Sequence, residues 1–175
     1  MTTVYYAKAA TVLGKFYVAT SDIGLCKLTL ECEEESSFFK WLHEKFNLVE
    51  ENYDKNEHII NQLKSYAKGN IKEFHTKFHL VGTPFQKKVW QALVSVPYGT
   101  VCSYKDIAVK IGTPKGFRAV GMANNKNNIP IIIPCHRIIG ANGSLVGYGG
   151  GLDFKRKLLS LEGVTIHEGK AVTNM

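Results

Sequence analysis

Three adjacent residues, Cys135, His136 and Arg137, bring together a nucleophile, a base and a cation. They lie in segment 129–139, which also carries three consecutive isoleucines and a proline at positions 130 and 134. The isoleucines favour the core, and the prolines exclude a helix interior or a continuous central strand. The cysteine is therefore expected where a buried segment must end, dry on one side and accessible on the other. This placement suits a nucleophilic thiol, whose thiolate nearby cations would stabilise. The alternative is an inert buried cysteine.

His136 needs help to act as the base for Cys135. Adjacent side chains generally point in different directions, so a bridging water would have to carry the thiol proton. A carboxylate on the far side of the imidazole would fix its tautomer and raise its basicity. Few acidic residues follow position 80, and Glu162, at the end of an expected helix, is the best candidate. The alternative for Glu162 is an ordinary exposed carboxylate.

The composition indicates a folded protein. The chain has 175 residues, of which 45% are hydrophobic, which fits one domain or two small ones. No apolar run approaches the length of a membrane span, and no signal peptide is visible at the N-terminus. We therefore expect a cytoplasmic protein (nuclear in a eukaryote), without membrane association and with its four cysteines reduced. No C-x-x-C pair occurs, so we expect neither a metal site nor a cofactor.

Charge is distributed unevenly along the chain. Up to position 80 there are 10 basic and 11 acidic residues, whereas the remainder has 12 basic and 4 acidic residues. These balances of −1 and +8 add up to the net charge of +7. A basic second half indicates a polyanionic partner, although plain solubility is an equally good explanation from composition alone.

The first half reads as strands followed by helices. We expect strands at 15–20, 24–31 and 74–80, and helices at 36–46 and about 56–67. Alternation in the second strand would place Cys26 and Cys32 together on its buried face. His75 and His79 lack the partners that a metal pair would need.

The second half predicts a helix-turn-helix. One helix begins at Pro84 after a Thr83 cap, and a second begins at Ser103. A third would follow Gly112, with Thr113 as its cap and Pro114 at its first position. Two short helices joined by a tight glycine turn, the second one basic, are typical of DNA-binding proteins. The third helix carries small residues and few long polar ones, which favours binding without regard to sequence.

The glycine-rich segment 140–151 lacks the spacing of a nucleotide-binding loop. Its glycines around Tyr148 favour a loop whose backbone approaches a flat ligand closely. A closing helix is expected at 152–161, and the last residues, from about His167, are expected to be a disordered tail.

These motifs resemble the O6-alkylguanine-DNA alkyltransferase family. The resemblance is carried by Pro134-Cys135-His136-Arg137-Ile138-Ile139 and by motifs in the same order across the second half. These are 82–86, Tyr98-Gly99-Thr100, Ser103-Tyr104, Pro114-Lys115, Arg118-Ala119-Val120-Gly121 and the stretch from Gly147-Tyr148 to Glu162-Gly163. The first half resembles the family only loosely, in Leu13-Gly14-Lys15 and the strands after it.

The resemblance implies an α+β fold with two domains. These would be an N-terminal α/β, ribonuclease H-like domain (1–80) and a mostly helical, winged-helix-like domain (81–167) carrying the helix-turn-helix, followed by a tail (168–175). It implies irreversible, single-turnover repair of duplex DNA, in which Cys135 takes the alkyl group from a flipped O6-alkylguanine. O4-alkylthymine is left open as a second substrate. A monomer is expected, and cooperative binding along DNA is left open.

The resemblance also assigns roles to residues. Arg118 would fill the gap left in the base stack, and Tyr104 would push the flipped nucleotide and offer its hydroxyl to the base. Asn127 would brace the active-site backbone, while His136 and Glu162 would relay the thiol proton. Remaining DNA contacts would come from Lys105, Lys115, Ala119 and Gly121, and the guanine pocket would be lined by Tyr148, Gly149, Ile138 and Pro130.

Some positions depart from the family pattern. Asn128 stands where proline is common, and Gly116 and Phe117 stand where alanines are usual on the helix that faces DNA. The zinc site of some relatives is not recognisable, because Ser21 and Cys26 occupy two of its aligned ligand positions and only one of them could bind the metal. None of these departures removes a catalytic group.

Two other functions are weighed against the transferase. A lesion-sensing protein that flips alkylated bases without reacting would lack the cysteine, which is present here. A cysteine hydrolase would usually place its histidine far from the cysteine in sequence, and would leave the basic helix-turn-helix unexplained.

Overall fold

The computed structural model describes residues 2–172. The chain forms two compact units that divide after Val81. Both helices and strands occur in each, and the expected α+β fold class is confirmed.

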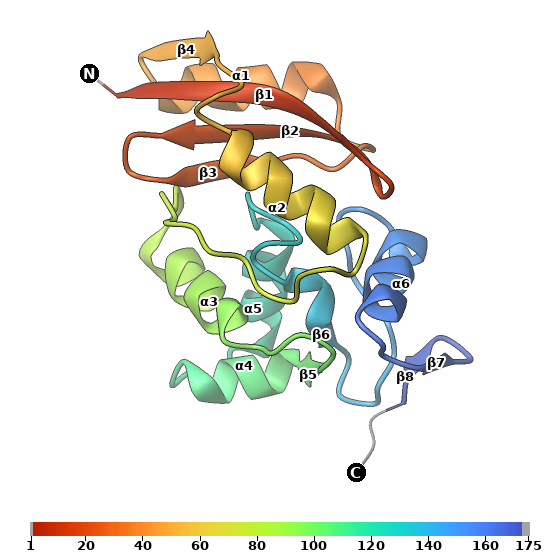
Figure 1. Cartoon of the computed structure of the whole chain (residues 1–175). Coiled ribbons are helices and arrows are strands. Elements are labelled where there is room, and N and C mark those ends of the chain that lie inside the picture. The colour runs from red at the N-terminus through yellow and green to blue at the C-terminus, as the bar shows by residue number, and fades with distance from the viewer. Residues whose placement is uncertain (1, 173–175) are drawn as a thin grey trace. The chain divides into compact units, whose positions relative to one another are not determined.

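The first unit is built on a four-stranded sheet with the order β3-β2-β1-β4 (Figure 1). Its strands are β1 (Thr3–Thr11), β2 (Gly14–Ser21), β3 (Leu25–Leu28) and β4 (Leu48–Glu51). The first three are antiparallel neighbours, and β4 pairs in parallel with β1. Strands β1 and β4 were not expected from the sequence, because neither shows a clean apolar alternation.

Two helices pack on this sheet, α1 (Glu35–Lys45) behind it and α2 (Glu57–Ala67) in front of it (Figure 1). Phe38 and Leu42 of α1 are buried against Val4, Ala19 and Cys26. The face of α2 that carries Ile59, Ile60 and Leu63 is buried as the sequence predicts. Each helix therefore buries one apolar face, which is what keeps the unit folded.

Two expectations for this unit are wrong. Strand β3 ends at Leu28, and a turn closed by the Glu33 amide and the Leu30 carbonyl leaves Cys32 exposed while Cys26 is buried. Segment 74–80 is not a regular strand, since only Phe78 forms a bridge, with Leu25. His79 instead makes a 2.7 Å hydrogen bond to the Ser21 hydroxyl.

The second unit is mostly helical. Its helices are α3 (Pro84–Val94), α4 (Tyr104–Lys110), α5 (Phe117–Asn125) and α6 (Leu152–Leu161), with a 3-10 turn, η1, at Cys135–Arg137. Short strands β5 (Cys102–Ser103) and β6 (Ile138–Ile139) pair in parallel. Thr83 and Ser103 cap α3 and α4, as predicted. Both caps form complete capping boxes, although the sequence predicts one only at Ser103.

Helix α5 begins later than predicted. The Gly116 amide donates to the Thr113 carbonyl at 2.7 Å, which closes a β-turn with Pro114 and Lys115 at its centre. Proline at the second position and glycine at the fourth favour this turn over a helix start. Thr113 is therefore not the cap, and Lys115 lies in the turn rather than on α5.

The expected disordered tail is wrong for the residues up to 172. Strands β7 (Ile166–His167) and β8 (Lys170–Ala171) form a hairpin, and Ala171 is buried beside Leu145, Leu159 and Val164. Residues 173–175 lie outside the described part of the chain. Within residues 2–172, no helix is long and apolar enough to cross a membrane.

Candidate active site

Segment 129–139 is buried throughout, so the prediction that it runs through the core is confirmed. The chain turns sharply within it, since the Ile132 amide donates to the Pro130 carbonyl at 2.9 Å across Ile131. Ile131 has a φ of 72°, a left-handed conformation that is strained for a β-branched residue. A second tight turn follows, with the Cys135 amide donating to the Ile133 carbonyl at 2.8 Å across Pro134.

Asn127 holds this strained segment closed. Its side-chain amide donates to the Ile133 carbonyl at 2.8 Å, and its side-chain oxygen accepts from the Ile129 amide at 2.9 Å. One side chain therefore satisfies two backbone groups on opposite sides of the turn. Its amide also lies close enough to the Cys135 sulfur to lower the pKa of the thiol.

Cys135 begins the 3-10 turn and is only 4% exposed. Burial is the largest influence on the pKa of its thiol and raises it. The hydrogen bond from Asn127 and the positive charge of Lys155 oppose that effect. The cation near the thiol is therefore Lys155, whereas the sequence suggested the neighbouring His136 and Arg137.

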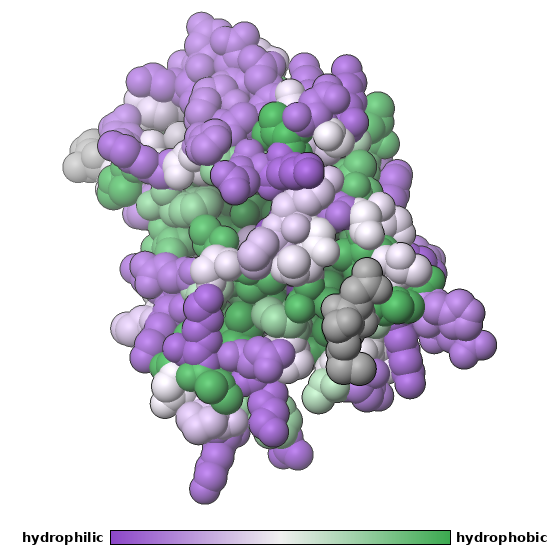
Figure 2. Space-filling model, turned by 60° about the horizontal axis from the view of Figure 1, so that its bottom comes forward, coloured by the Kyte–Doolittle hydropathy of each residue, from purple (hydrophilic) through white to green (hydrophobic). Residues whose placement is uncertain are grey.

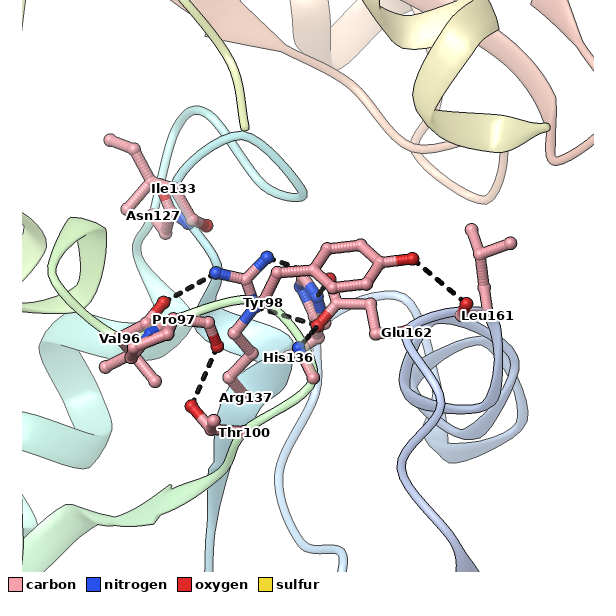
Figure 3. A network of polar contacts seen from close by, with 11 residues as sticks. Val96, Pro97, Tyr98, Thr100, Asn127, Ile133, His136, Arg137, Leu161 and Glu162 are labelled. Atoms are coloured by element: carbon pink, nitrogen blue, oxygen red, sulfur yellow. Dashed lines mark hydrogen bonds and ion pairs between the residues drawn. The ribbon is translucent and has the colours of Figure 1, made fainter. Parts of the chain in front are cut away.

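His136 and Arg137 both point at Glu162, at the C-terminal end of α6 (Figure 3). His136 Nε2 lies 2.7 Å from Glu162 Oε1, and Arg137 Nε and Nη2 each donate to the carboxylate at 2.9 Å. Arg137 Nη1 donates to the Val96 carbonyl as well. All three side chains are buried, so they form one enclosed ionic network.

The network sets the protonation states of its members. Burial would raise the pKa of Glu162, but hydrogen bonds from His136 and Arg137, with the charge of Arg137, outweigh it and lower the pKa to about 2. Burial lowers the pKa of His136 below its usual value of 6.5. The histidine is therefore a neutral base near pH 7. Its Nδ1 atom is buried and makes no hydrogen bond to the described residues, which leaves it able to accept a proton.

Lys155, on α6, is a further site residue that sequence reasoning missed. Its side chain is completely buried, and its ammonium group donates to the carbonyls of Ile138 and Val146. Burial lowers its pKa to about 8. Its position three and four residues before Leu158 and Leu159, and therefore on the same buried face of the helix, was the signal that could have revealed it.

The other expected pocket residues belong to the glycine-rich segment 140–151, contact it, or lie in segment 129–139. The Tyr104 hydroxyl is 3.2 Å from the Val146 carbonyl and 3.3 Å from that of Gly147. Burial and the nearby Cys135 raise the pKa of Tyr104. The ring of Tyr148 stacks on that of Phe154, with centroids 6.4 Å apart. Of the remaining expected residues, Ile138 and Pro130 are buried, while Gly149 is exposed.

Helices α4 and α5 form the predicted helix-turn-helix, but residues 111–116 join them rather than the two-residue turn that was expected. Gly112 begins this connection with a φ of 77°. Val120, Ala123 and Asn124 face the core of the unit, so the opposite face of α5 is exposed. Exposed there and around it are Lys105, Lys115, Arg118 and Ala119, whereas Gly121 is half-buried beside the Tyr104 ring. The structure thus separates a basic outer face from the buried thiol.

No group of three or more histidine, cysteine, aspartate or glutamate side chains comes together as a metal site within residues 2–172.

Comparison with known proteins identifies the class. The description "6-O-methylguanine DNA methyltransferase, ribonuclease-like domain" matches residues 4–80, and the DNA binding domain of the same class matches residues 84–164. The constitutive methylated-DNA–protein-cysteine methyltransferase of Bacillus subtilis is 39% identical over 165 residues, covering 94% of this chain and 98% of that protein. The chain belongs to the methylated-DNA–protein-cysteine methyltransferase family.

Two further relatives are informative. The methyltransferase of Methanosarcina acetivorans is 57% identical over 102 residues, which cover 58% of this chain and 65% of that protein. The match therefore spans a little under two thirds of that relative's length. The crystal structure of Mycobacterium tuberculosis OGT in complex with DNA has a TM-score of 0.77 and 37% identity, covering 91% of this chain and 92% of that one.

Proposed function

We propose that this protein repairs DNA by transferring an alkyl group from O6-alkylguanine to Cys135, irreversibly and once per molecule. The observation that carries the proposal is the buried Cys135 beside the His136–Glu162 pair, in a unit whose outer face is a basic helix-turn-helix. The family supports it, and so does the DNA complex of the Mycobacterium tuberculosis relative.

In this mechanism the proton of Cys135 passes through a water to Nδ1 of neutral His136. Glu162 holds the imidazole by its other nitrogen and stabilises the positive charge that develops. The thiolate then attacks the alkyl carbon. A sulfur–carbon bond forms while the bond from carbon to the guanine O6 breaks, and the electron pair leaves with the guanine.

Neighbouring groups place the flipped base. The Ile138 carbonyl accepts a hydrogen bond from Lys155 and keeps a second lone pair for a guanine amino group. The Cys135 carbonyl accepts from the Ile138 amide and, at 3.5 Å, from the Asn124 side chain, and the guanine amino group would take the place of the longer bond. Tyr148 lies in the glycine-rich segment 140–151, and the Tyr104 hydroxyl bonds to the same segment. We propose that these two rings, with Gly149 and Pro130, form the walls of the guanine pocket. The thioether product has no leaving group that water can displace, so the protein is consumed.

The helix-turn-helix would bind the duplex and bring the flipped guanine to the pocket. Arg118 would occupy the space vacated by the flipped guanine, and Ala119 and Gly121 would allow α5 to approach the minor groove. Lys105 and Lys115 would bind phosphates. We further propose a monomeric cytoplasmic protein that acts on duplex DNA.

The test is intact-mass analysis before and after incubation with a duplex that contains one O6-methylguanine, followed by peptide mapping. We expect one methyl group per protein, located on the Cys135 peptide. The Cys135→Ala variant should gain no mass while still binding the duplex. Unmodified wild-type protein bound tightly to the lesion would identify a sensor instead, and repeated turnover would identify a hydrolase.

A further inference from the structure

Helix α5 exposes a large aromatic side chain at its first residue. Phe117 is 46% exposed although phenylalanine is usually buried, and it lies on the outer part of the helix-turn-helix. A single exposed apolar residue is common on protein surfaces. Its neighbours are what make this one informative.

Phe117 stacks with Arg118. The guanidinium carbon of Arg118 lies 5.9 Å from the centroid of the Phe117 ring, within the range of a cation–π contact. Arg118 itself points away from the core, because Val120 and Asn124 occupy the buried side of α5. The ring and the guanidinium are therefore two flat groups displayed together at the start of the helix.

The surroundings of this pair are strongly basic. Exposed Lys105, Lys110, Lys115 and Lys126 lie on or beside α4 and α5, and Asp106, the nearby carboxylate on α4, is bound in the capping box of Ser103. Figure 2 brings the α4 end of the molecule forward and shows apolar side chains among long hydrophilic ones there. A flat apolar group ringed by lysines complements a polyanion that presents flat faces, which describes nucleic acid.

We propose that Phe117 is a second wedge residue, whose ring stacks on the base beside the gap that Arg118 fills in lesion-bearing duplex DNA. Proteins that bind the minor groove unstack base steps with side chains such as phenylalanine, and an aromatic ring recovers part of the stacking that extrusion removes. In the free protein the ring holds the guanidinium beside it, so both groups enter the duplex together. This inference rests on the proposed repair of DNA and names the residue that assists base extrusion.

The test compares rates of alkyl transfer from a duplex containing one O6-methylguanine with rates from free O6-benzylguanine, which needs no extrusion. For Phe117→Ala we expect the ratio of duplex rate to free-base rate to fall about tenfold, as for the loss of one base–aromatic stack. Phe117→Trp should keep the ratio and Phe117→Leu should lower it partly. Val109→Ala is the matched control, because Val109 is also an exposed apolar residue, 57% exposed, on the same motif.

A second measurement reports stacking directly. In the non-reacting Cys135→Ala background, 2-aminopurine is placed next to the lesion in the duplex. Its fluorescence should differ clearly between the proteins with Phe117 and with Phe117→Ala and should not change with Val109→Ala, because 2-aminopurine fluorescence depends on how the base is stacked. A double-mutant cycle combines Phe117→Ala with Arg118→Ala. The double variant should lower the ratio of duplex rate to free-base rate by less than the product of the two single fold-losses.

The inference is overturned if Phe117→Ala and Val109→Ala give the same rate ratio and the same fluorescence. It fails separately from the proposed function, since wild-type protein would still gain a methyl group on Cys135 in that case. If wild-type protein gains neither a methyl group from the duplex nor a benzyl group from free O6-benzylguanine, the proposed function itself has failed.

Discussion

Lys155 donates a hydrogen bond to the carbonyl of Ile138, the residue directly after the reactive Cys-His-Arg turn. The same ammonium group donates to Val146 in the glycine-rich loop at 2.9 Å. One buried cation thus ties together the two segments that border the thiol, and its charge lowers the pKa of Cys135 against the effect of burial.

Replacing Lys155 by methionine should therefore raise the pKa of the Cys135 thiol. A buried positive charge favours the thiolate, so its loss moves ionisation to higher pH. The rate of thiol alkylation by iodoacetamide, measured against pH with mass mapping of the Cys135 peptide, reports this pKa. Lys155→Arg should restore part of the shift. Lys157→Met removes an exposed charge from the same helix and is the control; an equal effect from it would contradict the assignment.

Replacing Glu162 by glutamine should change how stability depends on pH. The folded pKa of about 2 lies below the ordinary value of 4.5, so this carboxylate stabilises the fold above pH 4.5. That contribution, on the order of 3 kcal/mol, is lost as pH falls from 4.5 towards 2. Urea unfolding at several pH values should show this loss in wild-type protein and a much flatter profile in Glu162→Gln.

At pH 7 the Glu162→Gln variant should also be less stable than wild type, by about 3–5 kcal/mol, because Arg137 is left buried without its counter-ion. Asp153→Asn is the control, since the Asp153 side chain is 98% exposed. A pH profile for Glu162→Gln that matches wild type would show that the network does not set stability in acid.

Replacing Asn127 by alanine should loosen the turn before Cys135. The change leaves the Ile129 amide without its partner, and an unsatisfied buried group costs about 1–3 kcal/mol. It also removes one of the two hydrogen bonds that the Ile133 carbonyl accepts, the other coming from the Cys135 amide. Asn127→Asp keeps the acceptor for Ile129 but loses the donor to Ile133, so an intermediate loss is expected. Thermal unfolding measures both; equal stabilities for the two variants would contradict the two-sided clamp.

Affinity for duplex DNA should fall steeply as salt concentration rises, because each neutralised phosphate releases counterions. A logarithmic plot of affinity against salt should be linear, and Lys105→Ala should reduce its slope by about 1. Lys68→Ala, an exposed lysine in the first unit, should leave the slope unchanged. Fluorescence anisotropy with a labelled duplex gives both slopes, and a flat wild-type response would remove the basic face as the DNA-binding surface.

The parts of the fold that were predicted correctly rest on strong local signals. Thr83 with Pro84 and Ser103 with Asp106 specify helix starts by their own hydrogen bonds, so nearby sequence suffices. Strand β4 and the β7–β8 hairpin depend on partners elsewhere in the chain and carry little local pattern. At Thr113 two local signals compete, and the Pro114 turn prevails over the helix cap because Gly116 can close it.

Some features of the candidate site also follow from local sequence, whereas others depend on tertiary packing. Burial of segment 129–139 follows from its isoleucines, and Glu162 follows from the scarcity of carboxylates in the second half. The direction of Arg137 could not be predicted, because it depends on how α6 packs against η1. The helical spacing of Lys155 with Leu158 and Leu159 did place that lysine on the apolar face of α6, but only packing shows that its ammonium group is buried too. Composition offers no means of distinguishing a buried lysine from an exposed one.

The two-residue ladder between β5 and β6 has a mechanical consequence. It pairs Cys102 with Ile138 and Ser103 with Ile139, so the strand that caps α4 is bonded to the strand that follows the reactive turn. Backbone pairing therefore connects the start of α4, which would press on a DNA backbone, to the turn that would carry the nucleophile. The position of α4 and the orientation of the Cys135 sulfur are fixed relative to each other in the folded protein, before DNA binds.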